Sequence, residues 1–209
     1  MQTLDIVTLT VGQLQTNCYL VIDGTTSDAL IIDPGDDADY IERIISDKRL
    51  NPKSIIATHG HFDHILAVTE LTLAYKIPFL IHRGDEFLVS NMQNSAKHFE
   101  GIDVDPPPRI DKFIDELNLI TIGSHSLRVI HTPGHTPGSI CIYSKKESFL
   151  IGGDLLFAGG GVGRTDFSYS DPTLLAKSLK KVLLLPQDTI VYPGHGAETK
   201  IDIERSIYN

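Results

Sequence analysis

The stretch Thr58-His59-Gly60-His61-Phe62-Asp63-His64 places four potential metal ligands close together in the chain. Imidazole and carboxylate groups together are typical ligands of zinc and its first-row neighbours. His59 and His61 are two positions apart, so they point to the same side of an extended segment. If the chain changes direction here, His59 and His61 can serve one metal while Asp63 and His64 serve a second. The alternative interpretation is a histidine-rich surface loop that binds no ion.

The residues on both sides of this stretch predict that it forms a loop between a strand and a helix. The apolar run Ser54-Ile55-Ile56-Ala57 comes directly before it and is typical of a buried strand. Residues 65–75 follow it and are expected to form a helix. The four side chains would therefore lie at the carboxyl end of a strand, which is where α/β proteins commonly bind their ligands.

Length and composition favour a globular protein and argue against nucleic-acid and membrane partners. A chain of 209 residues is expected to form a single domain, 1–209, with a large core. The net charge of -9 argues against nucleic acid as the main partner, and no apolar run is long enough to cross a membrane. Cys18 and Cys141 lie in apolar runs and are expected to be buried thiols in a reducing compartment. Because the N-terminus has no signal-peptide pattern, we expect a cytoplasmic protein, and its oligomeric state stays open.

The pattern along the chain predicts an α/β protein built in two halves, each of which delivers candidate ligands at strand ends. Aspartates in 33–36 are expected to cap the helix that follows them, and Asp171-Pro172 is a good start for the last helix. Residues 101–109 contain three consecutive prolines and are expected to form a surface loop, with or without a role over the active site. The expected strands are 5–11, 17–23, 29–32, 54–57, 79–82, 117–122, 126–131, 139–143, 148–152 and 189–192, and the expected helices are 38–48, 65–75, 83–99 and 171–184.

Three further candidate ligands, His135, Asp154 and His195, follow other expected strands. Each lies beside glycine, which lets the backbone bend sharply and approach an ion closely. Taken alone, each residue has an ordinary structural explanation, such as a helix cap for Asp154. Their recurrence at separate strand ends, together with residues 59–64, favours a metal centre.

The same ordered motifs resemble the metallo-β-lactamase fold hydrolases, and more closely their short glyoxalase II-type members. The resemblance covers nearly the whole chain and is highly specific for the superfamily, but only moderately specific for the substrate. It is carried by Gln15-Thr16-Asn17-Cys18-Tyr19-Leu20, Ile32-Asp33-Pro34-Gly35, residues 58–64 and 131–138, Gly153-Asp154, Gly163-Arg164-Thr165-Asp166 and Pro193-Gly194-His195-Gly196.

This resemblance implies a four-layer αββα sandwich with two divalent metal ions in a groove at the strand ends. Zinc is the expected metal, and iron or manganese are alternatives. By position, the first ion would be bound by His59, His61 and His135, the second by Asp63, His64 and His195, and Asp154 would bridge them.

The implied activity is hydrolysis of a thioester such as a hydroxyacyl-glutathione. Two cations that share a water lower its pKa, so that hydroxide is available near neutral pH to attack the carbonyl. Asp63 is expected to orient this nucleophile as well as to bind metal. Asp33 and His131 are candidates for fixing ligand tautomers, with plain structural roles as the alternative. Arg164 matches a basic residue that contacts glutathione in longer glyoxalase II enzymes; the alternative is that it pairs with Asp166 and stiffens the loop.

Other functions stay open at this point. A persulfide dioxygenase shares the fold but needs one iron, and a non-catalytic metal-dependent sensor would also keep the ligands. The longer glyoxalase II enzymes have an additional helical C-terminal region, whereas this sequence ends 14 residues after His195, so the thiol carrier is undetermined. Asp154 stands where true metallo-β-lactamases have cysteine, which argues against lactam hydrolysis. The acidic charge disfavours a nuclease.

Overall fold

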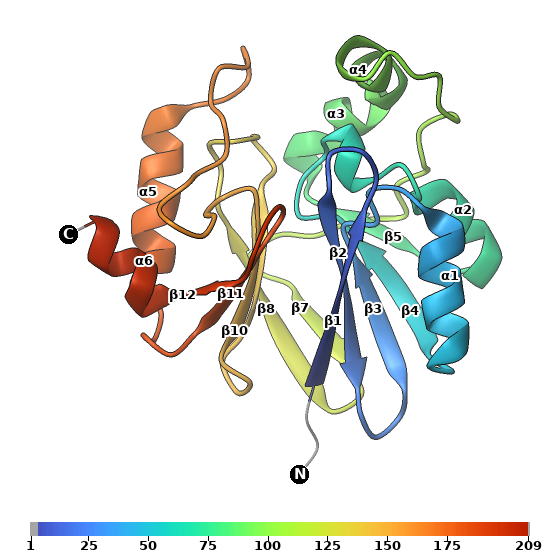
Figure 1. The fold of residues 1–209 in the computed structure, drawn as a ribbon, viewed down its shortest axis with the longest axis horizontal. Coiled ribbons are helices and arrows are strands. Elements are labelled where there is room, and N and C mark those ends of the chain that lie inside the picture. The colour runs from blue at the N-terminus through green and yellow to red at the C-terminus, as the bar shows by residue number, and fades with distance from the viewer. Residues whose placement is uncertain (1–3, 209) are drawn as a thin grey trace.

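Two six-stranded β-sheets lie face to face in the computed structural model, which describes residues 4–208 (Figure 1). In the first sheet the first three strands pair antiparallel, and the remaining pairs are parallel. Its strand order is β1 (Leu4–Val11), β2 (Thr16–Asp23), β3 (Asp28–Ile32), β4 (Asn51–Ile56), β5 (Phe79–Ile81) and β6 (Lys112–Phe113).

The second sheet is antiparallel except where β10 pairs parallel with β11. Its order is β12 (Thr199–Lys200), β11 (Ile190–Pro193), β10 (Phe149–Gly153), β9 (Ile140–Ser144), β8 (His125–His131) and β7 (Leu119–Ile122). Since β9 runs antiparallel to both β8 and β10, the strands β8, β10 and β11 all point the same way, and their carboxyl ends meet at one edge.

Both faces of each sheet are covered, which explains the continuous apolar runs of the central strands. Along β2, Cys18 and Leu20 pack beneath helices, whereas Tyr19 and Val21 pack between the two sheets. This alternation follows from the two-residue period of a strand. All eight residues of β2 are therefore buried.

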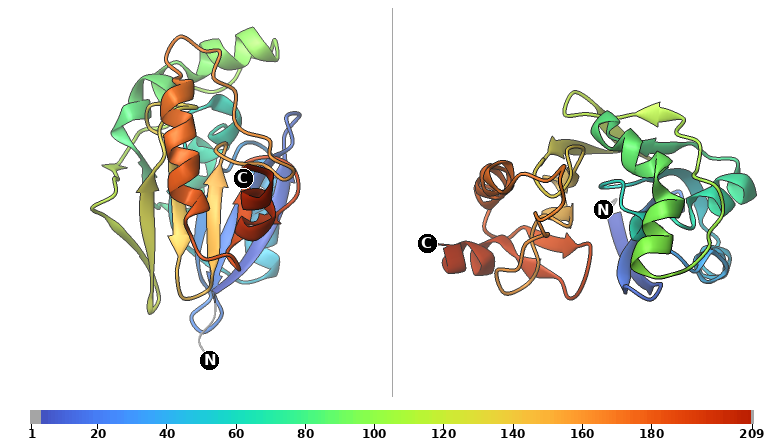
Figure 2. Two further views of the ribbon diagram at one scale, coloured as in Figure 1. Left: turned by 90° about the vertical axis from the view of Figure 1, so that its left-hand side faces the viewer. Right: turned by 90° about the horizontal axis from the view of Figure 1, so that it is seen from above.

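Helices on the outer faces complete four layers, so the predicted αββα sandwich is confirmed (Figures 1 and 2). The first sheet is covered by α1 (Ala38–Asp47) and α2 (Val68–Tyr75), and the second by α5 (Pro172–Leu183) and α6 (Ile201–Tyr208). Two short helices, α3 (Glu86–Ser90) and α4 (Met92–Phe99), lie above the first sheet together with the single turns η1 (Phe62–His64) and η2 (Arg83–Asp85). Within residues 4–208, no helix has the length and apolar content needed to cross a bilayer.

Three sequence-based expectations about the helices were wrong in detail. Helix 65–75 begins only at Val68, residues 83–99 form three separate helical pieces, and α6 was not expected. The predicted cap of α1 was also wrong, because its first flanking residue is Asp37, whose side chain accepts no capping hydrogen bond. The cap of α5 was right, since Asp171 accepts hydrogen bonds from the backbone amides of Thr173 (2.7 Å) and Leu174 (3.0 Å).

Candidate metal centre

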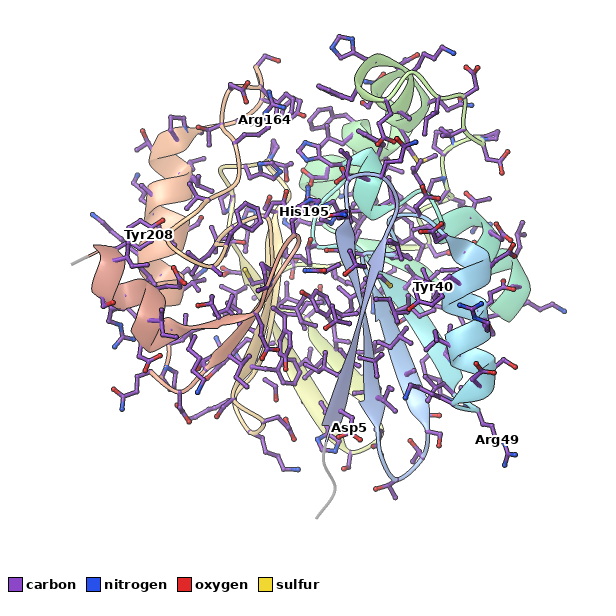
Figure 3. All side chains as sticks on the ribbon, viewed as in Figure 1. Asp5, Tyr40, Arg49, Arg164, His195 and Tyr208 are labelled. Atoms are coloured by element: carbon purple, nitrogen blue, oxygen red, sulfur yellow. The ribbon has the colours of Figure 1, made fainter. Side chains whose placement is uncertain are left out.

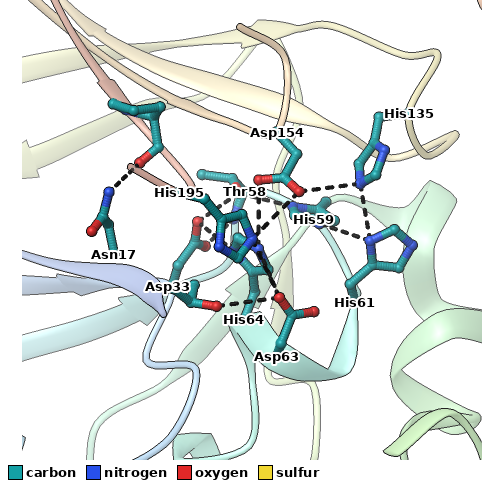
Figure 4. Close-up of polar contacts among 12 residues, drawn as sticks. Asn17, Asp33, Thr58, His59, His61, Asp63, His64, His135, Asp154 and His195 are labelled. Atoms are coloured by element: carbon teal, nitrogen blue, oxygen red, sulfur yellow. Dashed lines mark hydrogen bonds and ion pairs between the residues drawn. The ribbon is translucent and has the colours of Figure 1, made fainter. Parts of the chain in front are cut away.

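The loops after four strands bring all seven predicted metal ligands to one end of the sandwich (Figure 4). Residues 59–64 follow β4, His135 follows β8, Asp154 follows β10 and His195 follows β11. Residues 62–64 form the turn η1, which changes the chain direction as the sequence pattern required. The hairpin turn between β2 and β3 lies at the opposite end (Figure 1).

The first group of ligand atoms consists of three histidine nitrogens. His61 Nδ1 lies 3.0 Å from His59 Nε2 and 3.0 Å from His135 Nε2. Burial and the neighbouring histidines lower the pKa of His59 well below its usual value, and burial lowers that of His61 to about 3. The imidazoles of His59 and His61 are therefore neutral near pH 7, which is the form that binds metal.

The second group contains Asp63, His64 and His195. Asp63 Oδ2 lies 3.5 Å from His64 Nε2 and 3.4 Å from His195 Nε2. Asp154 lies between the two groups, because its Oδ1 is 3.6 Å from His64 Nε2 and its Oδ2 is 3.6 Å from His135 Nε2. The same Oδ2 lies 3.7 Å from His195 Nε2.

Two atoms at the centre of this arrangement fit a bound cation. His64 Nε2 and Asp154 Oδ1 are buried and have no hydrogen-bond partner. Native structures rarely leave such atoms unpaired, and a cation would supply the missing interaction. Burial opposes charge on His64, but the carboxylates of Asp63, Asp154 and Asp33 outweigh it and raise its pKa to about 10. The site therefore attracts positive charge.

Hydrogen bonds to the outer nitrogens of His59 and His64 fix which nitrogen faces the centre. His64 Nδ1 lies 3.1 Å from Asp33 Oδ2, so Asp33 meets the expectation that it fixes a ligand tautomer. Thr58 Oγ1 donates to the same Asp33 oxygen (2.7 Å) and lies 3.1 Å from His59 Nδ1. Asp33 does not cap α1 because its carboxylate is hydrogen-bonded to Thr58 and His64. This explains why the predicted cap was wrong for Asp33.

The remaining histidines are held by more distant parts of the chain. His135 Nδ1 contacts the carbonyl oxygen of Arg164 (2.8 Å), and His195 Nδ1 contacts that of Leu14 (3.1 Å). His61 Nε2 lies 2.9 Å from the hydroxyl of Tyr169. Every ligand histidine thus has a partner on its other nitrogen, which is typical of metal-binding histidines.

The expectation that His131 fixes a ligand tautomer was wrong. Its Nε2 contacts the carbonyl oxygen of Pro137 (2.9 Å), and its ring stacks on that of His82 with the centroids 4.3 Å apart. It therefore stabilises the loop that carries His135 without touching a ligand.

Gly194 is required by close packing against two ligands. A Cβ at this position would lie 2.1 Å from Asp154 Oδ1 and 2.9 Å from His64 Cε1. The same loop is held by Asn17, whose side-chain amide donates to the carbonyl oxygens of Pro193 (3.1 Å) and Gly196 (2.8 Å). This contact joins the two sheets directly behind His195.

Asp85 is an important residue that the sequence reasoning missed. It is fully buried and accepts hydrogen bonds from Gly60 N (2.9 Å), Gly138 N (2.6 Å) and Thr136 Oγ1 (2.6 Å). It therefore ties the loop of His59 and His61 to the loop of His135. An acidic residue shortly after the strand at 79–82 was the available signal.

A cleft of about 570 Å³ opens beside the ligands. Arg164 and His195 lie at this upper end of the molecule (Figure 3). Arg164 is in the wall of the cleft, and its Nε and Nη2 donate to Asp166 at 2.6 and 2.5 Å, so the alternative prediction of this ion pair is confirmed. The loop 101–109 does not line the cleft and instead contacts α2 and α4 through Pro106 and Val104. A role for this loop over the active site was therefore wrong.

The chain is similar to known proteins in both sequence and structure. The sequence profile of the Metallo-beta-lactamase superfamily matches residues 11–195. The chain is 38% identical to the probable metallo-hydrolase YqgX of Bacillus subtilis and 34% identical to the hydroxyacylglutathione hydrolase GloC of Haemophilus influenzae. Each alignment covers 93% of this chain and 92% of the relative.

Solved structures similar to this one include BLEG-1, described as a B3 metallo-beta-lactamase, with a TM-score of 0.90, 35% identity and coverage of 97% of both chains. TTHA1623 in a di-iron-bound form has a TM-score of 0.87 and 36% identity, over 95% of this chain and 96% of the other. ETHE1 from Myxococcus xanthus has a TM-score of 0.79 and 26% identity, over 96% of this chain and 81% of the other.

Proposed function

Because the chain belongs to the metallo-β-lactamase superfamily, whose fold implies divalent metal ions and metal-dependent hydrolysis, we propose that it is a thioester hydrolase of the glyoxalase II type. The single observation that carries the proposal is the position of Asp154 between two complete groups of ligand atoms. The similarity to GloC, named a hydroxyacylglutathione hydrolase, supports thioesters as the substrate class.

The proposed ligand sets follow these groups. His59, His61 and His135 would bind one ion, Asp63, His64 and His195 a second, and Asp154 would contact both. When bound, two such cations supply a nucleophilic hydroxide near neutral pH and stabilise the negative charge that develops on the substrate carbonyl. Zinc suits this ligand set, while the di-iron form of TTHA1623 makes iron the main alternative.

The protein's own residues orient the reaction. Asp63 Oδ2 is within 3.2 Å of Thr16 Oγ1, which donates to it and holds the carboxylate towards the cleft. We propose that Asp63 orients the attacking group as well as binding metal. Burial raises the pKa of Asp63, but His64 and His195 outweigh this effect and lower the pKa, so the carboxyl group is ionised. It can therefore accept a hydrogen bond from the attacking group but cannot donate one. A thiolate leaves without protonation, so the reaction needs no separate acid.

Three further assignments belong to this proposal. Arg164 lines the cleft and would contact the substrate, in addition to its ion pair with Asp166. Cys18 and Cys141 are free and buried, as expected from the sequence, and this supports a reducing, cytoplasmic setting. The net charge of -9 supports a small-molecule substrate over nucleic acid.

A substrate screen tests the proposal. The metal-reconstituted protein would be assayed with thioesters, lactones, phosphodiesters and a β-lactam, and Asp154→Ala serves as the matched inactive control. We expect metal-dependent release of thiol from thioesters and little turnover of the other classes. The similarity to BLEG-1 makes the β-lactam an essential comparison, although Asp154 argues against lactam hydrolysis. Oxygen uptake with glutathione persulfide and no thioester cleavage would replace the proposal by the dioxygenase alternative, and metal binding without any turnover would favour a sensor.

A further inference from the structure

The wall of the cleft is mainly apolar, although the metal centre beside it is highly polar. Three of the wall residues are notably exposed for apolar side chains, namely Leu14 (46%), Phe99 (49%) and Val162 (38%). Exposed apolar clusters next to convergent polar groups are typical of ligand-binding surfaces. The apolar wall consists of Leu14, Phe62, Phe99, Phe157, Val162 and Phe167.

Aromatic contacts make this apolar wall continuous up to the metal centre. Phe62 stacks on Phe99 with the ring centroids 6.2 Å apart, and Phe99 meets Phe167 edge-on at 6.0 Å. The ring of Phe167 in turn lies 5.3 Å from that of His61. These residues come from η1, from α4 and from the loop after β10, so both halves of the molecule build one surface. A planar apolar group on this wall would lie next to the ligands.

The cleft offers little attraction to an anionic substrate group outside the metal centre. Among the described residues that line it, Arg164 is the one cation other than the histidines. Its guanidinium pairs with Asp166 through two hydrogen bonds and lies over the ring of Phe167, 4.4 Å from the centroid. Glutathione carries two carboxylates, and in this cleft they would have to compete with Asp166 for Arg164.

We propose that the substrate is a thioester that carries a large apolar group, preferably aromatic, and no anionic thiol carrier. This inference rests on the proposed thioesterase function and names its substrate class. Stacking on the apolar wall stabilises the aromatic group, while the ion pair with Asp166 leaves Arg164 with little net attraction for an anionic carrier.

Four matched thioesters test the proposal with the metal-reconstituted protein. The acyl group is lactoyl or phenyllactoyl, which differ only in a phenyl ring, and the carrier is glutathione or the uncharged N-acetylcysteamine. We expect kcat/KM to be roughly ten-fold or more higher for phenyllactoyl than for lactoyl, as burial of an aromatic ring suggests. N-acetylcysteamine should exceed glutathione as the carrier.

Three variants assign these preferences to residues. Phe99→Ala should lower kcat/KM about five-fold for the phenyllactoyl esters and less than two-fold for the lactoyl esters, because it removes part of the apolar wall. Leu73→Ala is the control, since Leu73 is 73% exposed on α2 and does not line the cleft. Asp166→Asn should raise kcat/KM about two- to five-fold for the glutathione esters alone, because it frees Arg164 from an exposed ion pair.

A binding measurement separates this inference from the proposed function. Calorimetry would compare the thioethers S-phenylethyl-N-acetylcysteamine and S-phenylethylglutathione, which cannot be hydrolysed. If the uncharged thioether binds more tightly and Phe99→Ala weakens that binding, the inference is supported. If no thioester is cleaved as well, only the proposed thioesterase function fails. Thioester turnover with equal kcat/KM for all four esters, or with glutathione preferred, leaves the thioesterase function intact and overturns the inference.

Discussion

Replacing Asp85 by asparagine is expected to weaken both the fold and metal binding. In the native protein one carboxylate oxygen, Oδ2, accepts from Gly60 N and Thr136 Oγ1, and the other, Oδ1, accepts from Gly138 N. An asparagine amide oxygen can keep the first two hydrogen bonds. Its NH2 group would then face the amide of Gly138, a donor against a donor at a position where 2.6 Å separates the native atoms.

The size of the effect follows from that one opposed contact. Leaving a buried donor without an acceptor costs about 1–3 kcal/mol, so the free energy of unfolding should fall by about this amount. For a protein of this size each kcal/mol lowers Tm by roughly 2–4 °C. Because Asp85 sets the position of His61 relative to His135, metal affinity should fall about 10–100-fold, as for other residues that orient metal ligands.

Urea denaturation of the metal-free protein measures the stability, and competition with a chromophoric chelator measures the metal affinity. Asp23→Asn is the matched control, because Asp23 is also buried and accepts hydrogen bonds from the amides of Thr25 (2.7 Å) and Thr26 (3.1 Å). Asp23 lies at the end of β2 that points away from the metal centre. The control should lose stability and keep its metal affinity. The reasoning is refuted if Asp85→Asn binds metal as tightly as Asp23→Asn.

Three other substitutions have distinct expected outcomes. Asp154→Ala should abolish activity and lower the metal content below one equivalent, since Asp154 contacts both ligand groups; metal analysis that shows two retained ions would contradict this. Asp33→Asn should weaken binding of the ion near His64 about 10–100-fold and affect the other ion less, which stepwise metal titration can resolve. Glu204→Gln should raise KM more than it lowers kcat. Glu204 accepts hydrogen bonds from the amides of Gly159 (3.0 Å) and Gly160 (2.8 Å) and so holds the loop that enters the cleft. Unchanged steady-state kinetics would contradict that role.

The convergence of the candidate ligands could be predicted because their positions follow from local patterns. Each apolar run marks a strand, and the residue types directly after it mark a site, as with Gly153-Asp154 and Pro193-Gly194-His195. The parallel course of β3 and β4, and of β10 and β11, then brings these ends together. The sandwich itself was implied by the resemblance to the metallo-β-lactamase fold, and the alternation of β2 side chains between two core clusters agrees with it.

The supporting contacts could not be predicted because they join residues far apart in the chain. Asp33 was expected either to cap a helix or to fix a ligand tautomer, and its local sequence does not reveal that its partners are Thr58 and His64. Asp85 has no local partner that would distinguish it from a surface acid. The helix α6 was missed, and its buried Glu204 accepts hydrogen bonds from nearby Thr199 and from Gly159 and Gly160, which lie more than forty residues earlier in the chain.

Metal content of the purified and reconstituted wild-type protein tests the central claim most directly. With six candidate ligand residues in two groups of three and Asp154 between them, elemental analysis is expected to give two equivalents of zinc, iron or manganese per chain. A single tightly bound ion that stays at one equivalent in excess metal would contradict the two-ion centre and the hydrolytic mechanism built on it.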